Sequence, residues 1–272
     1  MYQAYGVLGR FLGHSLSPKL HNSAFQLAGM NRAYFKWEIM PEDLEVFMRA
    51  VRILPLSGIS VTIPYKEDVM SWLDYISPDA RGIGAVNTVY WENNSLCGTN
   101  TDYLGFLAPI RDMDFDSALV LGAGGACRAV LFGLKRLNVN KILLCNRHMD
   151  KALSMAGEFH VQAMPWEDRH RISADLLVNT TPLGTAGHWE NHTPWENDLF
   201  PFQAVYDLVY NPLQTRLLRQ ARIKGVQTVS GLSMFVHQGL EQFRIWTGQD
   251  FDPAWAEQVL TRYLSSSASN EN

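Results

Sequence analysis

The chain has 272 residues, of which 47% are hydrophobic and 18% charged, and its formal net charge at pH 7 is −4. This length suits one large or two ordinary globular domains, and the negative charge gives no support to a nucleic-acid or acidic-membrane partner. The three cysteines form no C-x-x-C pair, the N-terminus lacks a signal-peptide pattern, and no apolar run approaches about 18 residues. We therefore expect a cytoplasmic protein without a bound metal, and neither secretion nor membrane insertion is indicated.

Strands and helices are predicted to alternate over the first part of the chain. Short apolar runs indicate strands, apolar residues at helical spacing indicate helices, and Pro41 suits the start of a helix. In chain order we predict a strand at 5–8, a helix at 19–28, a strand at 33–39, a helix at 42–51, a strand at 59–63, a helix at 66–73, a hairpin of 86–91 and 96–98 across 92–94, and a helix at 103–110.

The segment 118–128 reads ALVLGAGGACR and predicts a nucleotide-binding turn. A short buried strand is followed by Gly122, Gly124 and Gly125, and then by an apolar helical run at 129–137. The third small residue of a G-x-G-x-x-G motif is here Cys127. Without Cβ atoms the backbone can approach a pyrophosphate, and the N–H groups of the helix start would hold its charge. The alternative is a tight strand-to-helix turn without a ligand.

A second buried strand is predicted at 141–145, and the residues after it bear on the choice of cofactor. An Asp or Glu at this place would bind the ribose hydroxyls of NAD. The chain has Asn146 and Arg147 instead, and Lys151 follows one helical turn later. A guanidinium suits the 2′-phosphate of NADP. Asp150 would repel that phosphate and favour NAD, and a solvated loop with ordinary surface charges is the other interpretation.

The rest of the chain continues the alternating pattern. We predict strands near 175–178 and 204–209, helices near 215–222, 237–246 and 253–264, and a disordered tail over the last eight residues. Two α/β halves follow from this order, with a small-molecule site expected in the cleft between them.

Four polar clusters in the first half stand at strand ends or turns. Each also has an ordinary structural interpretation, as a helix N-cap, a surface lysine or turn chemistry. The clusters are GHSLSP with Ser15 and Ser17, SVTIPYK with Thr62 and Lys66, GAVNT with Asn87, and GTNTD with Asp102.

Taken together, these clusters resemble one family. GHSLSPKLHN, SVTIPYK, GAVNT, GTNTDYLGF, LGAGGACRA, NTTPLG, VYDLVYNPLQT and GLSMFVHQGLEQF are similar, in order, to the successive motifs of the shikimate dehydrogenase family. The resemblance implies an α/β fold of two domains. Residues 1–102 and 237–272 would form an open α/β substrate domain to which the C-terminal helices return, and residues 103–236 a Rossmann-type NADP-binding domain.

The resemblance also implies roles for matching residues. In the substrate domain, Ser15 and Ser17 would bind the substrate carboxylate, and Thr62, Asn87 and Gln238 the ring hydroxyls together with Lys66 and Asp102; Tyr210 would lie beside the substrate. For the cofactor, Gly122, Ala123, Gly124, Gly125 and Ala126 would hold the pyrophosphate, Asn146, Arg147 and Lys151 the 2′-phosphate, and Leu208 and Gly231 would lie near the nicotinamide. The implied reaction is reversible reduction of 3-dehydroshikimate to shikimate by NADPH, a step toward chorismate and the aromatic amino acids.

The chemistry of hydride transfer explains why a lysine and a carboxylate belong together. Hydride arriving at a carbonyl carbon leaves an alkoxide-like oxygen, which needs a proton donor or a positive charge nearby. Lys66 would donate the proton, and Asp102 would orient Lys66 and bind the neighbouring hydroxyl. We predict that this pair is the acid/base unit.

The chain also departs from the family pattern at several positions. Ser60 stands where Asn is usual, Ser233 where Gly is usual, and His148 and Lys151 where Thr and Arg are commoner. Because lysine lacks the flat fork of arginine, selectivity for NADP could be weaker.

Three other functions stay open. They are a paralogue that uses NAD or prefers quinate, a non-catalytic nucleotide-sensing module, and a folate-type dehydrogenase, which would not need the paired serines. The expected partner is a small molecule. A homodimer is one option, since sequence does not distinguish an exposed apolar patch from core. We expect the two halves to hinge at the helix of Asp102 and near Gly231.

Overall fold

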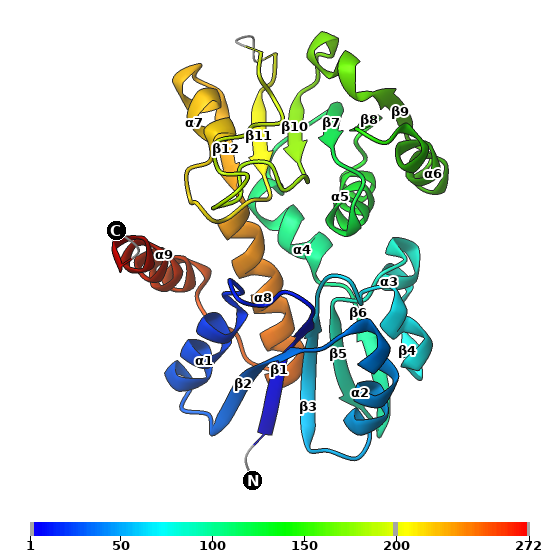
Figure 1. The fold of residues 1–272 in the computed structure, drawn as a ribbon, viewed down its shortest axis with the longest axis vertical. Coiled ribbons are helices and arrows are strands. Elements are labelled where there is room, and N and C mark those ends of the chain that lie inside the picture. Colours follow the sequence, from blue (N-terminus) through cyan, green and yellow to red (C-terminus); the bar gives the residue numbers. More distant parts are fainter. Residues whose placement is uncertain (1–2, 198–200, 271–272) are drawn as a thin grey trace. The chain divides into compact units, whose positions relative to one another are not determined.

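The computed structural model describes residues 3–197 and 201–270, and its internal contacts divide the chain into two compact units (Figure 1). Unit 1 comprises Met1–Asp102 and Val236–Tyr263, and unit 2 comprises Tyr103–Phe235 and Leu264–Asn272. Each unit contains a six-stranded sheet, so the predicted α/β fold class is confirmed. Within the part of the chain that is described, no helix combines the length and apolar character needed to cross a membrane.

The sheet of unit 1 is mixed. Its strands are β1 (Gln3–Gly9), β2 (Arg32–Glu38), β3 (Leu56–Val61), β4 (Tyr75–Ile76), β5 (Thr88–Glu92) and β6 (Ser95–Thr99), in the order β2-β1-β3-β5-β6-β4. β1 pairs in parallel with β2 and β3, whereas β5 is antiparallel to β3 and β6. The hairpin predicted across 92–94 is confirmed, with Asn93 and Asn94 at φ 49° and 64°, the left-handed values that a two-residue hairpin turn requires.

The helical segments of unit 1 correct one prediction. They are α1 (Ser17–Leu27), a 3₁₀ turn η1 (Pro41–Asp43) leading into α2 (Leu44–Val51), a 3₁₀ turn η2 (Asp68–Trp72), α3 (Pro78–Ile83), and parts of α8 (Gly231–Thr247) and α9 (Pro253–Asn270). The α-helix expected at 66–73 is absent: the segment forms only the 3₁₀ turn η2, and the Lys66 carbonyl bonds to the Val86 N–H at 2.8 Å, outside the segment. β4 and α3 were not predicted.

Both faces of the unit 1 sheet are covered, as alternate residues of β3 illustrate. Ile59 and Val61 pack with Met48 of α2 in one buried cluster. On the opposite face, a Cβ added at Gly58 would approach Trp246 Cδ1 of α8 to 2.6 Å. Ser60 lies on that same face and bonds to α8, so the polar position of this strand points at a helix rather than at solvent.

The sheet of unit 2 is entirely parallel. Its strands are β7 (Ser117–Leu121), β8 (Lys141–Asn146), β9 (Gln162–Pro165), β10 (Leu176–Asn179), β11 (Ala204–Asp207) and β12 (Gln227–Ser230), in the order β12-β11-β10-β7-β8-β9. The strand order reverses between β7 and β10. This strand order is that of a Rossmann sheet. In open α/β sheets, ligands bind outside the carboxyl ends of the strands at such a reversal.

Helices cover both faces of this second sheet (Figure 1). They include α4 (Asp102–Leu107) with η3 (Ala108–Ile110), α5 (Gly125–Arg136), α6 (Met149–Phe159), η4 (Trp166–Arg171) and α7 (Arg216–Ile223). Val120 packs with Leu131 of α5, and Leu119 packs with Leu217 of α7 on the other face. Burial on both sides explains why the strand reads as an unbroken apolar run.

Several boundaries in the second half differ from the predicted ones. α5 begins four residues before 129 and α8 six residues before 237, while α6, β9 and β12 were not predicted. The tail expected to be disordered is helical through Asn270, where α9 ends, and residues 271–272 lie outside the described part. Gly231 and the residues after it carry little helical signal, so sequence periodicity marks only the buried centre of a helix.

Candidate functional site

Lys66 and Asp102 form a close ion pair in unit 1. Lys66 Nζ donates to Asp102 Oδ2 at 2.6 Å, and the two side chains are only 16% and 11% exposed. Lys66 follows β3, and Asp102 follows β6 as the first residue of α4. The pair joins residues 36 positions apart, and its two groups are neighbours only because the sheet places the ends of these strands together.

Asn87 holds the other oxygen of this carboxylate. Its Nδ2 donates to Asp102 Oδ1 at 2.8 Å, and its Oδ1 accepts from the Thr101 N–H at 2.7 Å. The Asn87 N–H and C=O bond to Thr99 and Val61, so the residue is also fixed at its backbone. Both carboxylate oxygens of Asp102 therefore bond to predicted site residues. These contacts go beyond those of a residue that only caps a helix.

The other predicted substrate residues of unit 1 are distributed over three elements. Ser17 opens α1 and is buried, whereas Ser15 is half-buried and accepts from the Ser17 N–H at 3.4 Å. The N-cap of α1 is Leu16, so neither serine occupies that position. Thr62 is half-buried directly after β3, and Gln238 is buried in α8. The contacts of these four residues with a substrate stay predictions.

Tyr210 belongs to unit 2. Burial raises the pKa of its phenol above the ordinary value, and its ring lies 5.1 Å from that of Phe235, centroid to centroid. A neutral phenol can both donate and accept a hydrogen bond. Its predicted place beside the substrate stays a prediction.

A buried polar cluster that the sequence analysis missed lies under the Asn87 segment. Tyr34 Oη donates to Ser60 Oγ at 2.6 Å, and Gln242 Oε1 accepts from Ser60 Oγ at 2.8 Å and pairs with His21 Nε2 at 3.3 Å. The His21 ring also stacks on Tyr34. The one available sequence signal was Gln242, which stands four residues after Gln238 and hence on the same helix face.

Burial makes His21 a source of acid sensitivity. Loss of hydration lowers the pKa of its imidazole to about 3, compared with about 6.5 in an unfolded chain. The unfolded state therefore binds a proton first, so this contribution to stability is complete above about pH 6.5 and is lost as the pH falls toward 3. We expect the urea-unfolding free energy of wild-type protein to fall more steeply between pH 7 and pH 4.5 than that of His21→Gln. Parallel curves for the two proteins would contradict a neutral buried His21.

The glycine turn of unit 2 has a tight side and an open side. Gly122 has φ 105°, and an added Cβ would lie 2.7 Å from Thr180 Oγ1. At Gly124 and Gly125, an added Cβ would meet nothing within 4 Å. Because Gly125 begins α5, the open side lies where the unpaired N–H groups of a helix start can hold an anion. The turn therefore has room for the pyrophosphate predicted at Gly122, Ala123, Gly124, Gly125 and Ala126.

Two alanine substitutions separate these sides. Gly122→Ala is expected to lower the unfolding free energy by at least about 2 kcal/mol, because it combines an unfavourable φ with a steric clash. Gly124→Ala, at φ −103°, is expected to cost less than about 1 kcal/mol and to weaken dinucleotide binding by roughly tenfold. Urea unfolding and fluorescence titration with NADPH measure the two effects. Equal stability losses would contradict this assignment.

The predicted 2′-phosphate residues follow β8 into α6. Asn146 is half-buried and donates from Nδ2 to the His148 carbonyl at 2.9 Å, whereas Arg147 and Lys151 are exposed. Asp150 is also exposed, in the first turn of α6. The exposed side chains of Arg147 and Lys151 can therefore reach a bound phosphate, and Asp150 adds one carboxylate to the same short segment.

The residues predicted near the nicotinamide lie together. A Cβ added at Gly231 would run into the Leu208 backbone and approach the Val209 carbonyl oxygen to 2.8 Å. The Leu208 N–H bonds to the Asn179 carbonyl at the end of β10. Both residues therefore belong to the carboxyl edge of the parallel sheet, as the glycine turn does.

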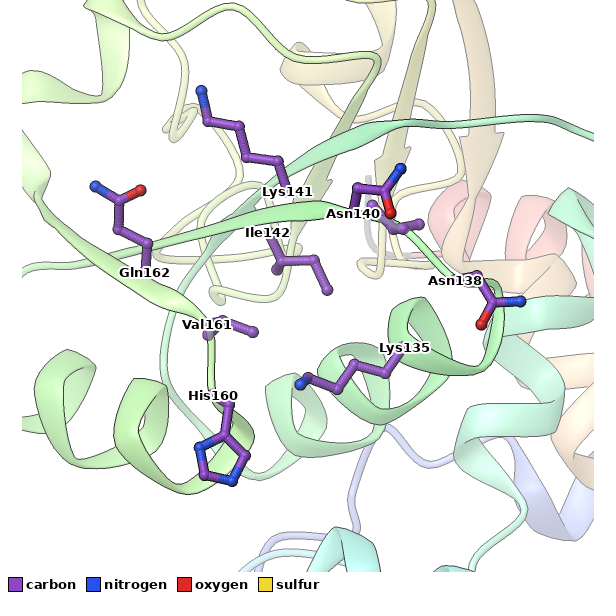
Figure 2. Close-up of a pocket in the computed structure, with 9 residues that line it drawn as sticks. Lys135, Asn138, Asn140, Lys141, Ile142, His160, Val161 and Gln162 are labelled. Atoms are coloured by element: carbon purple, nitrogen blue, oxygen red, sulfur yellow. The ribbon is translucent and has the colours of Figure 1, made fainter.

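A hollow of about 810 Å³ lies at the opposite, amino edge of this sheet, and it is lined by residues of the turns that lead into β8 and β9 (Figure 2). The polar ends of Asn138, Lys141 and His160 point in different directions around Ile142 and Val161. A ligand site needs polar groups that converge. The hollow contains none of the predicted cofactor residues, and it is not the candidate site.

Comparisons with known proteins agree on one family. Residues 7–89 match the model of the shikimate dehydrogenase substrate binding domain, and residues 231–260 match that of the shikimate 5′-dehydrogenase C-terminal domain. The shikimate dehydrogenase (NADP(+)) of Oleidesulfovibrio alaskensis is 45% identical over 97% of this chain and 96% of its own length.

Solved structures with a similar fold include a shikimate dehydrogenase and a quinate dehydrogenase. Shikimate 5-dehydrogenase from Thermus thermophilus, in complex with NADP(H) and shikimate, is 39% identical with a TM-score of 0.87, covering 96% of this chain and 99% of that one. Quinate dehydrogenase from Corynebacterium glutamicum, in complex with NAD, is 28% identical with a TM-score of 0.88, covering 96% of this chain and 100% of that one.

Proposed function

This chain belongs to the shikimate dehydrogenase family, and from that premise we propose that it catalyses the reversible reduction of 3-dehydroshikimate to shikimate with NADPH. The product of this step leads toward chorismate and the aromatic amino acids. The observation that carries the proposal is the Lys66–Asp102 pair, 2.6 Å long and held by Asn87, because a carbonyl reduction needs one positioned proton donor.

Lys66 is the acid/base residue of the proposal. When bound, the nicotinamide supplies the hydride to the carbonyl carbon. The Lys66 ammonium has three N–H donors, of which Asp102 accepts one, so others can reach the substrate oxygen. Lys66 gives its proton to that oxygen as the alcohol forms, and in the reverse direction its neutral amine takes the proton back. Asp102 holds Lys66 in place and accepts from the neighbouring hydroxyl.

The remaining residues bind and orient the two ligands. Ser15 and Ser17 bind the substrate carboxylate, and Thr62, Asn87, Gln238 and Tyr210 hold the ring. The open glycine turn at Gly124 and Gly125 supports NADP binding there, with Asn146, Arg147 and Lys151 at the 2′-phosphate and Leu208 and Gly231 beside the nicotinamide.

A second candidate is quinate dehydrogenation with NAD. It is supported by the likeness to the quinate dehydrogenase and by Asp150, which stands in the first turn of α6 close to Arg147 in sequence. A carboxylate there favours the ribose hydroxyls of NAD over a phosphate.

One experiment separates these candidates. Initial rates are measured for shikimate and for quinate, each with NADP⁺ and with NAD⁺, on purified wild-type protein. We expect shikimate with NADP⁺ to give the highest kcat/KM. Preference for NAD⁺ or quinate would favour the second candidate, and no turnover with any pair would favour a nucleotide-sensing module. A homodimer is also proposed, and light scattering of the same sample tests it.

A further inference from the structure

Gln242 lies in α8 one helical turn after Gln238, and its side-chain amide is fully occupied inside unit 1. An amide has two N–H donors and an oxygen with two lone pairs. Gln242 Nε2 donates to the Asn87 carbonyl at 3.2 Å and to Thr88 Oγ1 at 3.1 Å. Its Oε1 meets Ser60 Oγ at 2.8 Å and His21 Nε2 at 3.3 Å. The residue is 2% exposed, so it has neither surface nor hydrogen-bonding capacity left for a substrate.

The orientation of this amide is determined by its partners. The Asn87 carbonyl can only accept, so the NH₂ end of Gln242 must face it. The oxygen then faces Ser60 and His21, both of which must donate, and His21 therefore carries its proton on Nε2. His21 Nδ1 is left buried without a hydrogen-bond partner among the described residues.

The hydrogen bonds of Gln242 continue through Thr88 and Asn87 to the acid/base pair. Thr88 Oγ1 accepts from Gln242 and donates to Asn87 Oδ1 at 2.7 Å. Asn87 Oδ1 thus accepts from Thr88 as well as from the Thr101 N–H, so the NH₂ end of Asn87 is the end that faces Asp102. If the Asn87 amide turned over, its oxygen would face a carboxylate oxygen and the bond to Asp102 would be lost.

We propose that Gln242 is a positioning residue for the reaction, which fixes Asn87, and through it Asp102, without touching the substrate. The proposal rests on the proposed function, since that function places Asn87 at the substrate. The proposal gives different roles to two glutamines on one face of α8. Gln238 is assigned to bind the substrate, whereas Gln242 is assigned to hold the protein groups that bind it.

The first test is Gln242→Met, which keeps the length and removes all four hydrogen bonds. We expect kcat/KM for shikimate to fall about 10- to 100-fold, the effect of a small misplacement of reacting groups, with the KM for NADP⁺ unchanged. Glu241→Met is the matched control, because Glu241 stands next to Gln242 but pairs with Arg244 at a partly exposed position; its kcat/KM should stay within about twofold of wild type. Equal effects of the two substitutions would overturn the proposal.

A double-mutant cycle separates positioning from general loss of structure. In an Asn87→Ala background, Gln242→Met should lower kcat/KM by less than about threefold further, because the group that it positions is gone. Full multiplication of the two losses would overturn the proposal. If Gln242→Met fails to fold, Gln242→Glu replaces it in both backgrounds, because the new carboxylate can still accept from Ser60 but has no N–H group to donate to the Asn87 carbonyl. An inactive wild-type protein would overturn the proposed function and this inference together, whereas an active one with multiplying losses would overturn the inference alone.

Discussion

Replacement of Lys66 with alanine is expected to lower kcat for shikimate oxidation by roughly 10²- to 10⁴-fold, the usual contribution of a positioned proton donor or acceptor. The expected change in the KM for shikimate is smaller, because the ring and carboxylate contacts proposed for other residues remain. The physical reason is the geometry of the pair: Lys66 Nζ is 2.6 Å from Asp102 Oδ2 in a largely buried setting, where a bulk water molecule is a poor substitute for a fixed ammonium.

Two further variants sharpen this prediction. Lys66→Met keeps most of the aliphatic stem and should lose as much kcat as the alanine variant, which separates proton transfer from packing. Lys224→Ala, at an exposed lysine after α7, should leave kcat unchanged. Steady-state kinetics with urea unfolding of each variant provides the measurement, and an unaltered kcat for Lys66→Ala would exclude Lys66 as the acid/base residue.

Replacement of Arg147 with alanine is expected to change the choice of cofactor. A charge-assisted bond to a phosphate contributes about 1.5–3 kcal/mol, so the KM for NADP⁺ should rise roughly 10- to 100-fold. The KM for NAD⁺ should change less than about threefold, because NAD⁺ has no 2′-phosphate. Lys151→Ala should have the same direction and a smaller effect, since an ammonium lacks the paired donors of a guanidinium.

The control for this prediction is Arg171→Ala. Arg171 is 84% exposed and pairs with Asp168 in η4, outside the segment that follows β8. It should leave the KM for both cofactors unchanged. If Arg147→Ala raises the KM for NADP⁺ and NAD⁺ equally, the segment does not recognise the 2′-phosphate.

The elements that the sequence predicted best are those whose signal is local. The strands predicted at 118–121 and 141–145 contain unbroken apolar runs at 118–121 and 142–145, because both faces of the parallel sheet are buried. The hairpin follows from two asparagines that tolerate positive φ. Short edge strands were not predicted. For example, β4 has two residues and is too short to show the alternation of apolar and polar residues that marks a strand. The helix expected at 66–73 was wrong: the segment forms a 3₁₀ turn, and its first carbonyl, that of Lys66, bonds to Val86, a partner distant in sequence.

The candidate site divides in the same way. The resemblance of the motifs predicted that Lys66, Asp102 and Asn87 belong to the site. The structure joins these three residues by hydrogen bonds. Gln242 was not assigned, although it stands in a motif that was recognised. Its importance lies in which atoms it meets, on Asn87, Thr88, Ser60 and His21, and these residues come from separate parts of the chain.

The sequence by itself determined the α/β class, the family and the glycine turn, and it named the lysine and carboxylate that are predicted to move a proton, because each depends on residue types in a fixed local order. Only the tertiary structure decided that Lys66 meets Asp102 across 36 residues, which way the Asn87 amide faces, and that one side of the glycine turn is closed by Thr180. These facts depend on distances and directions between segments that are brought together by burial of the sheets. Spacing along the chain does not contain such directions.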